Sequence, residues 1–233
     1  MADWVTISSL ATAGGTLILA VATYGSVQSA NRSARVAEQS LLAGVRPVLI
    51  PSRESDPVER VRFGDEQIVN VPGHGAAVEF ANNVVYLALA LRNGGSGLGV
   101  LHGWRARAQP PRERQVVSRG ARLFEDAPPV DSAVGTEPGL KEFRRQQLDL
   151  YIPAGDTGYW QGALRDPEEP GYVEVRDAID DDRGIWIDLL YGDYEGGQRT
   201  IVRIGVSPWP DIDGERAYVL RYWNVDRQDP RSS

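Results

Sequence analysis

The glycine-rich stretch from Asn93 to Gly99 is the first candidate for chemistry, because glycine-rich loops can cradle phosphate groups with their backbone N–H groups. In phosphate-binding loops the glycines open a helix, and in one large class a Gly-Lys-Ser/Thr sequence follows. Here the chain continues through Val100, Leu101 and Trp104 as a predicted strand, without that sequence. We therefore predict a tight connection between two strands and expect no cofactor.

Metal-binding side chains are few. The chain has no cysteine and only two histidines, so a zinc site would need His74 and His102 brought together with carboxylates by the fold. Acidic residues cluster at Asp180–Asp182 and again at Asp211, Asp213 and Glu215, where DIDGE resembles the start of a calcium loop with its glycine too early. Solvated turns are the better interpretation, with a fortuitous calcium site as the alternative, and we expect no metal.

No catalytic motif is present in the sequence. There is no G-x-S-x-G elbow, and neither histidine adjoins a nucleophile motif. We expect no catalytic residues and no enzyme activity; a hydrolase would need His74 or His102 beside a nucleophile in a cleft. The net charge of −7 also disfavours nucleic acid, whose phosphates attract basic surfaces.

The N-terminal segment from Val5 to Val27 contains no charged residue, and as a helix it would span about 35 Å, enough for a bilayer. We predict a transmembrane helix over residues 1–28 and a helical stalk over 29–44. A buried core helix and a cleaved signal peptide are the alternatives. The residues expected to contact lipid are Trp4, Val5, Leu17, Ile18, Leu19 and Tyr24.

The charges after this segment predict its orientation. Arg32, Arg35 and Arg46 outnumber Glu38, so the positive-inside rule predicts a single-pass protein of the cell membrane. Its N-terminus would lie outside and the rest of the chain in the cytoplasm.

Small residues recur along the same segment at the spacing of a helix-packing seam, which would let two helices approach closely. A homodimer through the helix is therefore a possible outcome, with a chance match in a segment rich in small residues as the alternative. The residues of this seam are Ala11, Ala13, Gly15, Thr16, Ala20 and Thr23.

From residue 45 the chain changes to short β-type runs separated by Gly, Pro, Asn and Asp. We predict a mainly β domain over 45–225, an antiparallel two-sheet sandwich of immunoglobulin-like or jelly-roll type, followed by an extended tail over 226–233. A hairpin is expected around Tyr194–Gln198, and a helical turn within Tyr172–Asp182. The predicted strands cover 45–52, 66–71, 84–92, 98–108, 147–152, 159–164, 185–191, 200–206 and 217–225.

Three short motifs carry a family resemblance: Arg46-Pro47, Asn93 to Gly97, and Tyr191 to Asp193. With the N-terminal segment, they resemble a family of uncharacterised single-pass membrane proteins from high-GC bacteria. The resemblance implies a β-sandwich anchored by a helix, and it implies no activity or functional residues.

The leading hypothesis is a non-enzymatic, membrane-anchored domain that binds an unknown protein partner or organises a membrane-associated assembly. The alternative is an outward-facing sandwich that binds glycan through exposed tryptophans. The burial of Trp104, Trp160 and Trp209 should separate the two.

Overall fold

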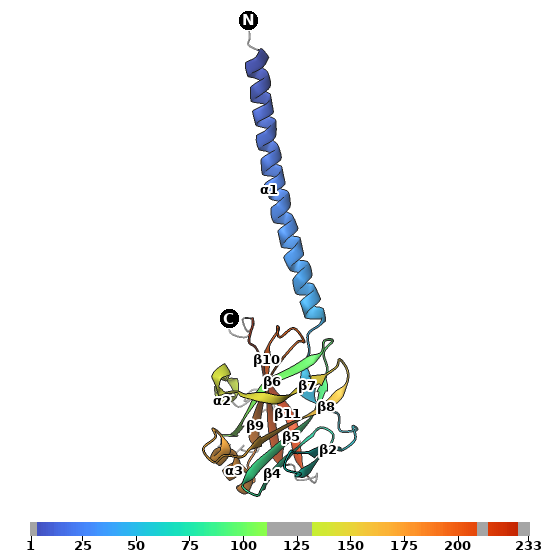
Figure 1. The fold of residues 1–233 in the computed structure, drawn as a ribbon, viewed down its shortest axis with the longest axis vertical. Coiled ribbons are helices and arrows are strands. Elements are labelled where there is room, and N and C mark those ends of the chain that lie inside the picture. Colours follow the sequence, from blue (N-terminus) through green and yellow to red (C-terminus); the bar gives the residue numbers. More distant parts are fainter. Residues whose placement is uncertain (1–3, 111–131, 209–213, 228–233) are drawn as a thin grey trace, which may run out of the picture. The chain divides into compact units, whose positions relative to one another are not determined.

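The computed structural model describes residues 4–110, 132–208 and 214–227. The chain divides into two units, Met1–Gly44 and Val45–Ser233 (Figure 1). The first unit is a single helix, α1 (Trp4–Gly44). It ends at a glycine three residues before Pro47, as the sequence predicts, since proline cannot continue the helical hydrogen bonds.

The predicted transmembrane helix is wrong. Within the described residues, no helix is both long and apolar enough to cross a membrane. The prediction equated an uncharged segment with an apolar one, but Ala, Gly, Ser and Thr add little hydrophobicity per residue. Along α1, Thr23 Oγ1 and Ser26 Oγ donate to the carbonyls of Leu19 and Ala22, at 2.7 and 2.9 Å.

The second unit is built on one antiparallel sheet of nine strands. Strand β5 pairs with β1 and β4 along one edge and with β8 along the other. The order along the sheet is β1 (Leu49–Pro51), β5 (Val84–Asn93), β4 (Gly75–Ala81), β11 (Glu215–Asn224), β10 (Thr200–Pro208), β9 (Ile185–Gly192), β6 (Gly99–Ala108) and β7 (Arg144–Ile152), with β8 (Thr157–Leu164) on the far side of β5.

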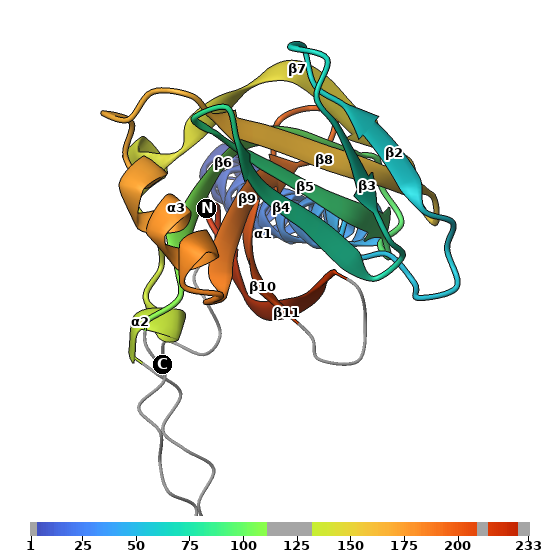
Figure 2. The same cartoon turned by 90° about the horizontal axis from the view of Figure 1, so that it is seen from below.

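The predicted two-sheet sandwich is therefore also wrong. Instead of two sheets facing each other, the single sheet curls until its inner face encloses one core (Figure 2). The alternating residues Ile185, Ile187, Leu189 and Tyr191 of the predicted strand 185–191 are all buried in that core. Alternation reports which face is buried, but a curled sheet and a sandwich share that pattern.

A small hairpin explains why β5 is apolar on both faces. Strands β2 (Glu59–Arg62) and β3 (Ile68–Val71) pair with each other and cover the outer side of β5 (Figure 2). Val85, Leu87, Leu89 and Leu91 point into the main core, whereas the residues between them pack under the hairpin. That second cluster consists of Val61, Phe63, Val69, Val71, Ala77, Tyr86, Ala88 and Ala90.

The described residues of the domain also form three short helices: α2 (Ser132–Gly135), η1 (Leu140–Glu142) and α3 (Tyr172–Asp180). Helix α3 buries Tyr172, Val175 and Ala178 against the core and is longer than the single turn expected. The expected hairpin is present, because β9 and β10 are antiparallel neighbours. Gly196 has φ +78° in its turn, a conformation that glycine adopts without strain.

Glu215 on β11 gives the domain a predicted pH dependence. Burial raises its pKa to about 7, and the nearby Glu79 and Asp182 add to the increase, against backbone hydrogen bonds that lower it. The folded state thus holds a proton that the unfolded state releases near pH 4.5, so stability falls as pH rises from there to about 7. In denaturant titrations, Glu215→Gln should flatten this dependence. Glu195→Gln, at an exposed position, should not, and an equal effect would contradict the assignment.

Candidate functional site

The sheet has an opening between its two end strands. Strand β7 pairs only with β6, and β8 only with β5, although a turn of four residues, Pro153–Asp156, joins β7 to β8. No pairing between β7 and β8 exists in the described part of the chain. Two consecutive strands that would ordinarily form a hairpin instead lie at opposite ends of the sheet and leave facing edges unpaired.

A bulge in β7 lies beside this opening. Leu101 of β6 pairs with Leu150, but Gly103 pairs with Arg145, so the segment Gln146–Asp149 faces His102 alone. Gln146–Asp149 have no partner in the register of the described strands. Within the bulge the Leu148 side chain is 72% exposed, which is unusual for a leucine in an alternating strand.

Both ends of the opening are fixed. At the turn, the buried Asn93 side chain donates to the carbonyls of Ile152 and Gly97, and its backbone bonds the turn at Asp156. At the far end, Arg144 of β7 donates to Ala163 O at 3.3 Å and forms an ion pair with Glu169 at 2.7 Å. The Arg144 guanidinium also lies 4.9 Å from the Trp104 ring. The opening is therefore a stable part of the fold, held at both ends.

The cavity in the opening has a volume of about 930 Å³. Its walls come from β7 and β8, and apolar surface from Trp104, Leu150 and Tyr159 is interspersed with amides. Gln146 Oε1 and Gln161 Oε1, one from each strand, are buried without a hydrogen-bond partner in the described part of the chain. Buried polar atoms normally find partners, so two unmatched acceptors facing one cavity indicate a place for donors from another molecule.

Four of the charged side chains around the opening form two ion pairs. Asp65 accepts hydrogen bonds from Arg165 and from Tyr86 Oη, which lower its pKa to about 2. Arg144 and Glu169 form the pair described above. Asp65 and Glu169 are thus already held by arginines, and the rest of the lining combines the carboxylate of Asp149 and the guanidinium of Arg145 with amide and apolar surface.

Comparison with known proteins gives no assignment. No family model, curated protein or solved structure matches the chain. The resemblance to single-pass membrane proteins of high-GC bacteria stays a prediction.

The glycine-rich stretch is a connection between β5 and β6, as predicted. Three of its N–H groups are engaged: Gly94 and Ser96 donate to the carbonyls of Val48 and Arg46, and Gly95 donates to Asn93 Oδ1. A Cβ at Gly97 would lie 1.7 Å from Val45 O, so the glycines serve close backbone packing.

The two histidines do not form a common site. His74 is in the loop before β4, where its backbone N–H donates to Ser52 Oγ and its ring bonds Ser52 O. His102 is in the β6 bulge, and burial and the nearby Arg199 lower its pKa. Among the described residues, no group of three or more His, Cys, Asp or Glu could hold a metal ion. Asp211 and Asp213 lie outside the described residues.

The tryptophans of the described domain are mostly core residues. Trp104, Trp160 and Trp223 are at most 5% exposed, and Trp186 is partly buried. Trp209 lies outside the described residues. The described rings therefore offer no exposed aromatic set of the kind that the glycan-binding alternative requires.

The residues predicted on the N-terminal helix are placed in part. Leu17, Ile18, Leu19 and Tyr24 are exposed on α1, and so are Gly15, Thr16, Ala20 and Thr23 of the seam. The side chains of Trp4, Val5, Ala11 and Ala13 lie outside the described residues. Self-association, contact with lipid and the cytoplasmic orientation stay predictions.

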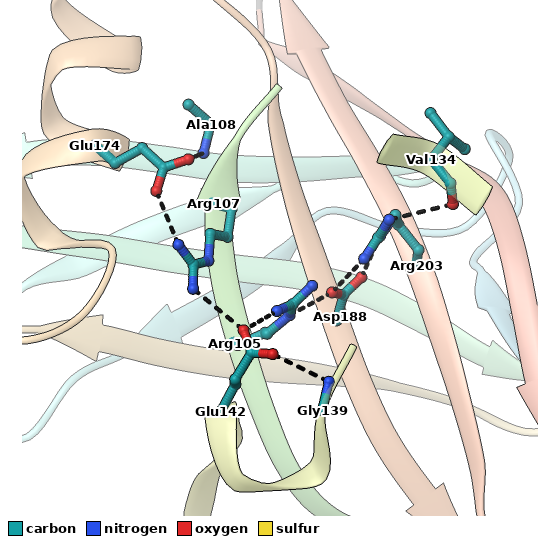
Figure 3. A network of polar contacts seen from close by, with 9 residues as sticks. All are labelled: Arg105, Arg107, Ala108, Val134, Gly139, Glu142, Glu174, Asp188 and Arg203. Carbon is teal, nitrogen blue, oxygen red and sulfur yellow. Dashed lines mark hydrogen bonds and ion pairs between the residues drawn. The ribbon is translucent and has the colours of Figure 1, made fainter. Parts of the chain in front are cut away.

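A second polar cluster lies on the outer side of β6, β9 and β10 (Figure 3). Its centre is Asp188, which accepts two hydrogen bonds from Arg203, at 2.8 and 3.0 Å, and one from Arg105 Nε at 2.6 Å. Arg203 is buried between the rings of Trp186 and Trp223, at 4.6 and 4.9 Å from their centroids. The sequence did not reveal this cluster, because Arg105, Asp188 and Arg203 are isolated charges on three different strands.

Proposed function

We propose that the β domain binds an extended segment of a partner protein, which adds as a strand in the opening between β7 and β8. Binding by strand addition needs an unpaired strand edge, which supplies backbone hydrogen bonds, and neighbouring pockets, which select side chains. The role is one of binding, without a catalytic step. The observation that carries the proposal is the unpaired bulge Gln146–Asp149 beside a cavity of about 930 Å³.

The composition of the edge supports this role. Natural edge strands are commonly protected by lysine, proline or inward-pointing charges, which prevent pairing with other chains. The bulge in β7 contains two glutamines, an exposed leucine and one aspartate. Seven consecutive residues of β7, Arg144–Leu150, line this side of the cavity, and an extended segment of that length spans about 23 Å.

The chemistry of the lining defines the partner segment. An apolar side chain of the segment would pack against Leu148 and Leu150, and its N–H groups would donate to Gln146 Oε1 and Gln161 Oε1. We therefore expect a segment with a central Leu, Ile or Val and no proline at the donor positions, because proline has no N–H group.

Peptides selected by display against the full-length chain provide the test. Leu148→Asp should weaken binding of the selected peptides at least about tenfold, since it removes an apolar contact and adds a charge at the interface. The fold should be unaffected because Leu148 is largely exposed. Isothermal titration calorimetry gives the dissociation constants.

Leu140→Asp is the matched control, because Leu140 is 43% exposed and is not part of the cavity lining. It should leave the affinity unchanged. Failure to select any peptide, or equal affinities of the wild type and Leu148→Asp, would contradict the proposed function.

A further inference from the structure

The outer polar cluster borders a second cavity, separate in its lining from the opening between β7 and β8. This cavity has a volume of about 530 Å³, and four arginines line it: Arg105, Arg107, Arg183 and Arg203. Trp186 contributes an aromatic surface, and Glu142 and Glu174 contribute carboxylates. Such a concentration of guanidinium groups is typical of sites that recognise carboxylate or phosphate.

Two of these arginines donate to the same carboxylate oxygen, which belongs to Glu142 of the protein itself. Glu142 Oε2 accepts from Arg105 Nη1 and, at 3.2 Å, from Arg107 Nη2. The second oxygen, Oε1, accepts from Gly139 N at 3.0 Å and closes the η1 turn. Burial raises the pKa of Glu142, but the hydrogen bond from Gly139 and the two arginines lower it by more. The net effect is a pKa below the usual value of a glutamate, so the side chain is ionised at neutral pH. Glu142 therefore already acts as an anion between two cations.

Buried groups hold Arg105 in position, whereas the partners of Arg107 are partly exposed. Arg105 is 14% exposed, and its Nε donates to Asp188, which the buried Arg203 fixes in turn. Arg107 is 41% exposed, and its other contact is Glu174 at 3.4 Å. A guanidinium has five N–H donors, so a single shared oxygen uses little of what this pair can donate.

We infer that Arg105 and Arg107 form a binding site for a small oxyanion, a carboxylate or a phosphate group, in which Glu142 occupies the position of the ligand. An incoming group with two or three free oxygens can bond both arginines in the paired geometry that guanidinium favours. The contact between Arg107 and Glu142 is easily exchanged, because both side chains are about two-fifths exposed, at 41% and 42%, and exposed ion pairs contribute little stability.

Glu142→Gln tests this inference in the full-length chain, with inorganic phosphate and succinate as separate probes. Glutamine keeps the oxygen that accepts from Gly139 and removes the competing charge. Calorimetric titration should show binding of at least one probe to Glu142→Gln about tenfold tighter than to the wild type. Adding Arg107→Gln to that variant should abolish the gain. The response to the two probes separates phosphate from carboxylate as the preferred group.

Glu66→Gln is the matched control. It also removes one carboxylate from an exposed ion pair with an arginine, Arg62–Glu66 at 3.0 Å. Its affinity for both probes should equal that of the wild type. The inference is overturned if neither probe binds Glu142→Gln, if Glu66→Gln gives the same gain, or if the gain persists with Arg107→Gln. Denaturant unfolding of each variant shows that these outcomes concern folded protein.

Discussion

Replacing Arg203 by alanine is expected to lower the free energy of unfolding by about 3–5 kcal/mol, the range for breaking a buried ion pair from one side. Arg203 and Asp188 have side-chain exposures of 1% and 2%, and Arg203 also donates to Val134 O at 3.2 Å. Without the guanidinium, Asp188 would keep Arg105 as a partner but would lose two of its three hydrogen bonds. The loss should appear as a lower midpoint in urea unfolding.

Arg62→Ala is the control for this prediction. Its ion pair with Glu66 is 65% and 81% exposed, so removing it should change the free energy of unfolding by less than about 1 kcal/mol. If Arg203→Ala were no more destabilising than Arg62→Ala, the buried ion pair of Arg203 and Asp188 would not contribute to the stability of the domain as predicted.

Trp160→Ala is expected to destabilise the domain by about 3–5 kcal/mol, as for other large-to-small replacements of fully buried aromatic residues. Trp160 is 0% exposed, and its ring packs edge-to-face on Trp104 with centroids 5.2 Å apart. Gly162 makes this packing possible, since a Cβ there would lie 2.6 Å from the Trp160 ring and 2.9 Å from the Trp104 ring.

Trp160→Phe separates the two contributions of the indole. The Nε1–H of Trp160 is buried without a hydrogen-bond partner among the described residues, and an unmatched buried donor costs about 1–3 kcal/mol. Phenylalanine removes that donor and keeps most of the apolar contact, so its cost should be less than half that of alanine. Equal destabilisation by both variants would contradict this expectation, since it would show that a phenyl ring recovers none of the lost contact.

The sequence predicted local structure well where the pattern of a strand is repeated without interruption. The residues from Ile185 to Tyr191 and from Thr200 to Val206 form β9 and β10, and the glycines after Tyr194 form their turn. Strand β4 was missed because Ala76 and Ala77, small residues, give a weak β signal, and β2 was missed because charges surround its single buried residue, Val61.

The candidate site was not predictable from alternation. Leu148, Leu150 and Ile152 alternate along the sequence and would share one face of a regular strand, yet Leu148, in the β7 bulge, is exposed and Ile152 is buried. A bulge changes the register without changing the residue types, so periodicity within one strand does not reveal it. Whether the ends of a sheet meet depends on long-range pairing and curvature, which no single segment encodes.

Two features of the sequence did point toward the site. Asn93 follows a strand and begins the glycine run, and the structure uses its side chain to tie that turn to the end of β7. Gly158 and Gly162 interrupt β8, and glycine inside a strand often marks a close approach by another group. These signals indicate unusual local packing, but they do not specify a ligand.

Amide hydrogen exchange of the full-length chain, with and without a display-selected peptide, tests the central claim most directly. If the peptide adds as a strand, the amides of Gln146–Asp149, which have no partner in the register of the described strands, should exchange more slowly in the complex, with a matching decrease along the free edge of β8. Unchanged exchange in both segments while the peptide is bound would contradict strand addition at this opening.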